Sequence, residues 1–75
     1  MTRPITTSPE TWLLQLQRTR AATSGGVIRR RVREVERIVG RSDFHLELKR
    51  RGWHAVENAG EFIIFCNREP VRIFA

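Results

Sequence analysis

The sequence predicts an α+β fold in which two or three helices pack on a three-stranded antiparallel meander, in the order ααα-βββ. Two changes at one point in the chain lead to this prediction. Apolar residues recur at helical spacing up to residue 51, and short β-type runs follow Gly52. Residues 1–51 hold twelve basic and five acidic side chains, whereas residues 52–75 hold two and three. A basic helical half therefore precedes a nearly neutral half of strands.

The size and the cysteine content limit the class of protein. A chain of 75 residues forms one small hydrophobic core, so we assign residues 8–75 to a single domain and residues 1–7 to a flexible N-terminal arm. Cys66 is the only cysteine, which excludes an internal disulfide and favours a reducing compartment, here the cytoplasm. No apolar run approaches the length that crosses a membrane, so no membrane partner is expected.

The first helix is expected over residues 8–20. Ser8 is a good N-cap, Pro9 suits the first helical position, and Trp12 and Leu16 share one apolar stripe. The segment "AATSGG" that follows has the composition of a loop or hinge.

A second helix is expected over residues 27–39, where the periodicity is clearest. Its apolar stripe follows the spacing i, i+4, i+7 and i+11, at Ile28, Val32, Val35 and Val39. Gly40 suits the position just after a helix.

The third helix is expected over residues 43–51. Ser42 is its candidate cap, Asp43 lies in its first turn, and Gly52 ends it. The basic residues of its last turn suit the helix dipole.

Three strands are expected after Gly52, at residues 53–58, 61–67 and 71–75, with a tight hairpin between the first two. The middle strand is apolar on both faces, whereas a strand with one face in water should alternate. Either helices cover both faces of the sheet, or one face meets another protein. We expect Val35 and Phe65 to be buried, and the second apolar face predicts a homodimer.

The arginine run at residues 29–31 is the most unusual feature of the sequence. Near a helix N-terminus each exposed cation opposes the dipole by roughly 0.3–1 kcal/mol, so helix stability does not explain these residues. On a helix, Arg30, Arg33 and Arg37 would form one ridge opposite the apolar stripe, flanked by Arg29. Such a ridge suits phosphate oxygens, which guanidinium groups bind bidentately.

The predicted nucleic-acid-binding residues lie on two helices: Arg29, Arg30, Arg33, Arg37, Lys49, Arg50 and Arg51. Three alternatives remain open for them. Glu34 and Glu36 can pair with arginines three or four residues away, which would make this a solvated face. The basic helix can instead dock an acidic protein. The arginine content can also reflect GC-rich coding DNA.

Residues 27–51 also have the lengths of a helix-turn-helix, with "GRS" as the turn. Glu36, four residues before the turn glycine, stands where a close-packed motif prefers a small residue. The sheet that follows is then a candidate wing.

The segment from Phe44 to Phe74, "FHLELKRRGWHAVENAGEFIIFCNREPVRIF", resembles HicA-type mRNA interferase toxins. Gly52, Trp53, Gly60 and Pro70 fall in places comparable with that family, so residues 43–75 are similar to its dsRBD-like α-β-β-β arrangement. The family carries a catalytic histidine just after the hairpin glycine, where this sequence has Glu61. The resemblance therefore implies an RNA-binding sheet without ribonuclease activity.

No residue pattern in the chain predicts catalysis, a metal or a cofactor. His45, His54 and Cys66 supply at most three zinc ligands, and their spacing matches no usual zinc pattern. Trp53, His54 and Phe74 are candidate stacking platforms for single-stranded RNA, or parts of the core.

The sequence thus predicts a small non-catalytic protein that either binds nucleic acid, RNA or DNA, or has a regulatory role. The alternative is a protein-interaction module, a small inhibitor or adaptor that docks through its sheet or its basic helix.

Overall fold

The computed structural model describes residues 8–75 and confirms the α+β class. The predicted arm, residues 1–7, lies outside the described residues. The elements follow the order ααβααββ: α1 (Pro9–Gln17), α2 (Arg20–Ser24), β1 (Val27–Arg31), α3 (Val32–Ile38), α4 (Arg41–Arg51), β2 (His54–Asn58) and β3 (Glu61–Phe65).

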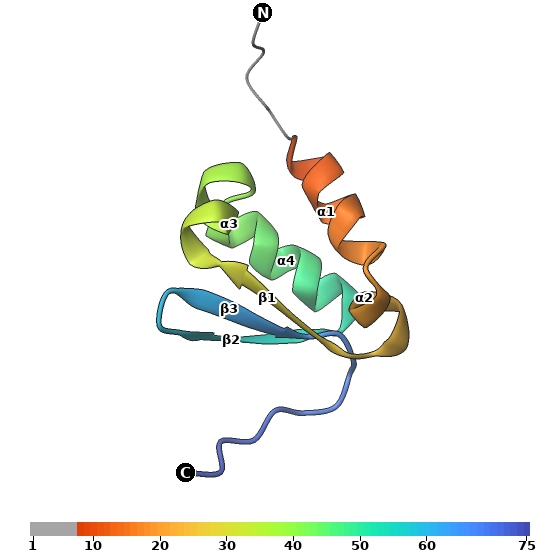
Figure 1. Ribbon diagram of the computed structural model, residues 1–75, viewed down its shortest axis with the longest axis vertical. Helices are drawn as coiled ribbons and strands as arrows, with labels where there is room; N and C mark the ends of the chain where they lie inside the picture. Colours follow the sequence, from red (N-terminus) through yellow and green to blue (C-terminus); the bar gives the residue numbers. More distant parts are fainter. Residues whose placement is uncertain (1–7) are drawn as a thin grey trace, which may run out of the picture.

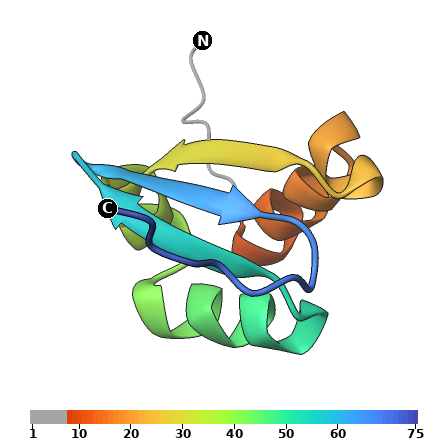
Figure 2. The same ribbon diagram turned by 90° about the horizontal axis from the view of Figure 1, so that it is seen from below.

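The three strands form one antiparallel sheet in the order β1-β3-β2, with β3 in the middle (Figure 2). Since β3 runs antiparallel to both neighbours, β1 and β2 run parallel to each other, and α3 and α4 connect them. The helices lie on one side of this sheet (Figure 1). This two-layer arrangement buries one face of the sheet and leaves the other without a helix.

Two predicted elements are wrong in a related way. The helix predicted over residues 27–39 is a strand over Val27–Arg31 and a helix over Val32–Ile38 only. The strand predicted over residues 71–75 is absent, and that segment extends away from the sheet (Figure 1). The two differences have one cause, because β1 occupies the free edge of β3 that a third meander strand would need.

The limits of the other helices differ in detail from the predictions. Ser8 caps α1 as expected, and its hydroxyl accepts a hydrogen bond from the Thr11 amide at 3.1 Å. The predicted loop is partly helical, since α2 covers Arg20–Ser24. Ser42 does not cap α4, which begins at Arg41, two residues earlier than predicted and directly after Gly40.

The β2–β3 hairpin is closed by Ala59 and Gly60, which both have positive φ, 52° and 78°. Two consecutive positive φ angles at the turn centre are the geometry of a type I′ turn, which matches the twist of a hairpin. The glycine was predicted for this role. From the sequence, Asn58 is the other residue expected to have positive φ. In the structure the second positive φ falls on Ala59 instead.

The core lies between the inner face of the sheet and the helices. An aromatic row connects three elements: Trp12 of α1 lies 6.3 Å from Phe44 of α4, and Phe44 lies 5.0 Å from Phe62 of β3, measured between ring centroids. Val35 and Ile64 are the most completely buried side chains. The remaining core residues come from the predicted stripes and from β1: Leu16, Ile28, Val32, Val39, Leu48 and Cys66.

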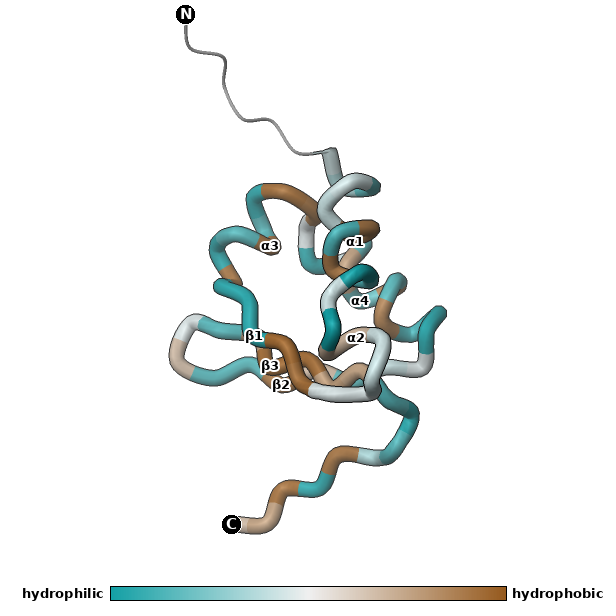
Figure 3. The backbone as a smooth tube through the Cα atoms, turned by 45° about the vertical axis from the view of Figure 1, so that its right-hand side comes forward, coloured by the Kyte–Doolittle hydropathy of each residue, from teal (hydrophilic) through white to brown (hydrophobic). Residues whose placement is uncertain are grey.

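The outer face of the sheet carries Ile63 and Phe65 of β3, as the alternation predicted, and no helix covers it (Figure 1). Phe65 is therefore only half-buried, and the prediction that it belongs to the buried core is wrong. β1 and β3 are hydrophobic at the end near α2 and hydrophilic at the end near α3 (Figure 3). The sheet is thus polar around the β2–β3 turn.

The same substitution at two valines tests this description of the core. Val35 is 0% exposed and Val27 is 50% exposed. Val35→Ala should lower the free energy of unfolding by about 2 kcal/mol, because two methyl groups are lost and a cavity is left. Val27→Ala should lower it by much less. Urea unfolding curves measure both values, and equal effects would contradict the assignment of Val35 to the core.

Candidate nucleic-acid interface

The arginine run lies in strand β1, so its side chains alternate between the two faces of the sheet. Arg29 and Arg31 point to the outer face, and Arg30 points to the inner face beside α1. The predicted helical ridge of Arg30, Arg33 and Arg37 is therefore wrong. Arg30 is separated from the other two, which lie one turn apart on α3.

Neither Arg29 nor Arg30 is a free surface cation. Arg29 forms an ion pair with Glu61 on the outer face, with an Nη1–Oε1 distance of 3.4 Å. Arg30 is half-buried, and its Nη1 donates a hydrogen bond to the Arg29 carbonyl at 2.7 Å. These two predicted contact residues thus have partners within the fold.

In the predicted Lys49–Arg51 cluster, Glu47 forms ion pairs with Arg50 and Arg51 but not with Lys49. This carboxylate accepts hydrogen bonds from Arg50 at 2.9 Å and from Arg51 at 2.6 Å. Partial burial raises the pKa of Glu47, but the two arginines outweigh this effect and lower the pKa below its ordinary value. The Arg51 guanidinium also lies 5.4 Å from the Trp53 ring centroid, a cation–π distance.

Arg31, Arg33 and Arg37 form no ion pair with any residue of 8–75, and the same holds for five further arginines: Arg18, Arg20, Arg30, Arg68 and Arg72. The first three, together with Glu34, line a shallow surface depression of about 310 Å³ at the junction of β1 and α3. Glu34 forms no ion pair with them within 4 Å, and its Oε2 accepts a hydrogen bond from the Trp12 indole at 3.0 Å. We call Arg31, Arg33 and Arg37 the arginine cluster.

Sequence reasoning left Arg31 out of the predicted site because on a helix it would fall within the apolar stripe. The strand places it at the end of β1, directly before α3, and fully within reach of solvent. The alternation of side chains in a strand was the signal that would have found it.

Arg41 is the second residue that the sequence did not indicate. It begins α4 and connects three elements, because its Nε donates to Glu36 of α3 at 2.6 Å and its two Nη atoms donate to Glu57 of β2 at 2.9 Å. Its guanidinium also lies 5.4 Å from the ring centroid of Phe62. Hydrogen bonds to Glu57 and Glu36 raise the pKa of Arg41 above its ordinary value. No local sequence pattern predicts contacts between residues 41 and 57.

The helix-turn-helix interpretation of residues 27–51 can apply only to α3 and α4, because residues 27–31 of its expected first helix form strand β1. The sequence argued against this motif because Glu36 stands where a small residue is preferred. In the structure Glu36 lies on the exposed side of α3 and accepts a hydrogen bond from Arg41, so its size causes no clash. Gly40 has a φ of 91° in the turn between α3 and α4, a conformation that glycine adopts at little cost. The exposed side of α4 carries Ser42, His45 and Lys49, and Lys49 forms no ion pair within residues 8–75.

Within residues 8–75, no group of three or more histidine, cysteine or acidic side chains is placed to hold a metal ion. Burial raises the pKa of the Cys66 thiol, which disfavours the reactive thiolate. None of the described helices is both long and apolar enough to cross a membrane.

Of the three candidate stacking residues, Trp53 and His54 are neighbours in the chain, whereas Phe74 lies in the C-terminal segment. Trp53 is half-buried against the core with Arg51 over its ring, His54 is exposed on the edge strand β2, and Phe74 is exposed in the C-terminal segment. They form no common platform on the sheet.

Comparisons with known proteins give no information about the function of this chain. No protein family matches the chain, and no curated protein or solved structure matches it either.

The Arg41–Glu57 contact predicts a pH dependence of stability. The hydrogen bond from Arg41 lowers the pKa of Glu57 from its ordinary value of 4.5. A lowered carboxyl pKa contributes stability above the unfolded-state value, and the contribution is lost as pH falls through the folded-state value. Glu57→Gln should therefore lower the melting temperature at neutral pH, and the difference from wild type should shrink in acid.

Thermal unfolding followed by circular dichroism at several pH values measures this difference. Glu69→Gln is the control, because Glu69 forms no ion pair within residues 8–75. A Glu57→Gln effect that stays constant from neutral pH into acid would show that the carboxylate charge is not the cause.

Proposed function

We propose that the chain is a non-catalytic nucleic-acid-binding protein of the cytoplasm that binds phosphate groups through the arginine cluster. The observation that carries this proposal is that Arg31, Arg33 and Arg37 line one surface depression and that none of them has an ion pair within residues 8–75. Guanidinium groups without partners on one surface suit phosphate oxygens, which they bind in pairs of hydrogen bonds.

The charge of the chain supports the same partner. The net charge is +6, which attracts polyanions from a distance and raises the rate of encounter. An exposed cation near a helix N-terminus is unfavourable for the helix, and Arg33 occupies the first turn of α3. This position is costly for folding alone and useful for binding an anion.

Double-stranded DNA suits the arrangement of α3 and α4 best. In a helix-turn-helix the first helix crosses the phosphate backbone and the second lies in the major groove. Here Arg33 and Arg37 on α3 would contact phosphates, and His45 and Lys49 on α4 would face base edges. The β2–β3 hairpin, whose turn lies beside the start of α3, would be the wing.

The dependence of binding on salt tests the proposal. Affinity for a short duplex should fall steeply between about 50 and 200 mM salt, because each neutralised phosphate releases counterions. Arg33→Gln should flatten the slope of log K against log salt by about one unit and weaken all sequences alike. Fluorescence anisotropy of a labelled duplex measures both the affinity and the slope.

Arg20→Gln is the matched control, since it removes the same charge from α2, at the other end of the domain (Figure 1). It should leave the slope nearly unchanged. Single-stranded RNA and double-stranded RNA are tested beside DNA. If RNA binds more tightly than DNA, RNA and not DNA is the partner. Affinity that ignores salt, or equal effects of the two variants, would overturn the arginine cluster as the phosphate site.

A second candidate function, protein interaction through a homodimer, has one observation of its own. The outer face of the sheet has no helix over it, and Val27, Ile63 and Phe65 on it stay partly or largely exposed. A second sheet packed on this face would remove these side chains from water.

Light scattering at micromolar concentration tests the dimer. We expect twice the 8.8 kDa mass of the chain for the wild type. Ile63→Lys should return the mass to one chain, because it places a charge in the apolar contact. Leu14→Lys is the control, since Leu14 is an exposed leucine on α1, on the opposite layer. A wild-type protein of single-chain mass would rule out this interface.

A further inference from the structure

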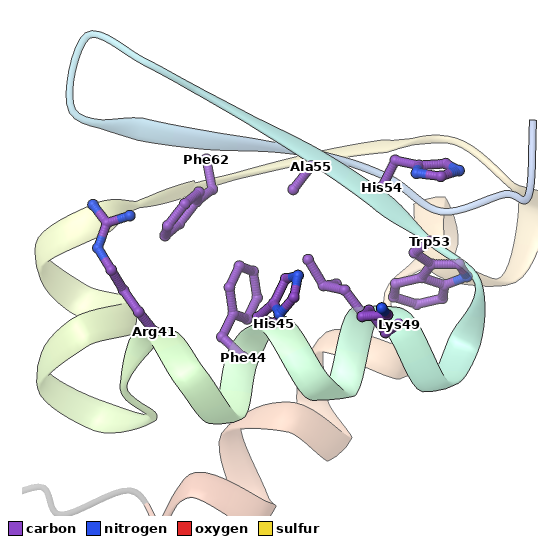
Figure 4. Close-up of a pocket in the computed structure, with 9 residues that line it drawn as sticks. Arg41, Phe44, His45, Lys49, Trp53, His54, Ala55 and Phe62 are labelled. Atoms are coloured by element: carbon purple, nitrogen blue, oxygen red, sulfur yellow. The ribbon is translucent and has the colours of Figure 1, made fainter. Parts of the chain in front are cut away.

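A cleft of about 430 Å³ lies between α4 and the edge strand β2. Its volume falls within the range of small-molecule sites, about 300–1,000 Å³. Phe62 and Ala55 point into it from the sheet, and Phe44 approaches from α4 (Figure 4). With Leu48 these side chains form an apolar floor.

The cleft is open because Ala55 is small. Ala55 is the inward-facing residue of β2 between Trp53 and Glu57, and it lies opposite Ile64 of the central strand. A larger side chain at this position would fill the space between β2 and α4. The space is therefore set by one residue and can be closed by a single substitution.

The polar groups around the floor are cationic or imidazole, and no carboxylate lines the cleft. Arg41 is already engaged, because its three nitrogen atoms bond Glu36 and Glu57. His54 lines the cleft from β2, but alternation along the strand turns its side chain toward the outer face. The groups that remain for a ligand are His45 and Lys49, one turn apart on α4 (Figure 4).

This combination selects a definite ligand chemistry. The floor of Phe44, Leu48 and Phe62 favours an apolar body, and the ammonium group of Lys49 favours an anionic head. The Arg51 guanidinium lies 5.4 Å from the Trp53 ring centroid, so one face of this ring is already covered. Lys49 has no carboxylate partner within residues 8–75, so it needs no rearrangement to bind an anion.

We propose that the cleft between α4 and β2 binds an amphipathic organic anion, with its apolar body on the floor and its carboxylate, sulfonate or phosphate on Lys49 and His45. This site contains none of the arginine cluster on β1 and α3, but it shares His45 and Lys49 with the side of α4 that is proposed to face base edges. Its test contains no nucleic acid, so its outcome does not depend on the proposed function.

Two fluorescent probes with the same ring systems separate the charge from the apolar contact. Anilinonaphthalene sulfonate carries one negative charge, and phenylnaphthylamine lacks the sulfonate. The folded protein should bind one sulfonate probe per chain, about tenfold more tightly than the neutral probe, because a charge-assisted hydrogen bond is added. Equal affinities, or no binding of the sulfonate probe, would overturn the proposal.

Three variants test whether the probe binds in the cleft. Lys49→Gln should weaken the sulfonate probe about tenfold and leave the neutral probe unchanged. Arg20→Gln, with the same loss of charge outside the cleft, should change neither. Ala55→Leu should abolish binding of both probes by filling the floor.

Exposed core surface in an unfolded variant also binds such probes, so each variant is first checked by its thermal unfolding curve. If Ala55→Leu does not fold, Ala55→Val makes a smaller change that a strand accepts well, and it should weaken both probes. In the wild type, the Trp53 indole and His45 imidazole signals in NMR spectra should shift as the probe is added. Unshifted signals, or a Lys49→Gln variant that binds like the wild type, would place the probe elsewhere and refute the site.

Discussion

Pairing of the central strand along both of its edges is the constraint on which the rest of the structure depends. β3 is hydrogen-bonded to β1 and to β2, and its inward side chains Phe62 and Ile64 meet the helices. Backbone groups left unpaired in such an apolar strand would be costly, so a partner on each edge is required. The partner on the second edge is β1, the strand that contains the arginine run, and not the C-terminal segment.

This pairing decides which arginines are neutralised. On a helix the run would have formed one ridge, whereas on a strand it divides between two faces. Arg29 then meets Glu61 across the sheet, and Arg31 is left at the strand end beside Arg33 and Arg37. Exposed ion pairs contribute about 0–1 kcal/mol each, so their main consequence here is to show which cations have no internal partner. Among the arginines of β1 and α3, those left without a side-chain hydrogen bond or ion pair within residues 8–75 are the arginine cluster.

Local signals in the sequence predicted the parts of the fold that depend on interactions between residues close in the chain. The cap at Ser8, the hairpin glycine and the inward pattern of β3 are all as expected. The spacing of Ile28, Val32, Val35 and Val39 did not distinguish one long helix from a strand followed by a helix, because both place these residues inward. The choice depends on pairing between residues 30 to 38 positions apart. The contacts of Arg41 with Glu57 and the cleft above Ala55 are likewise tertiary, so sequence reasoning missed both.

Solution NMR of the β1–β3 pair tests the central claim that the arginine run is a strand. The Cys66 amide donates to the Gly26 carbonyl and the Val32 amide to the Gly60 carbonyl, so the alternate pairs Arg29–Ile63 and Arg31–Glu61 do not share hydrogen bonds. The Hα atoms of such pairs approach closely. The structure predicts nuclear Overhauser effects between Hα of Arg29 and Hα of Ile63, and the same between Arg31 and Glu61. Helical contacts three residues apart within 27–31, without these cross-strand signals, would contradict it.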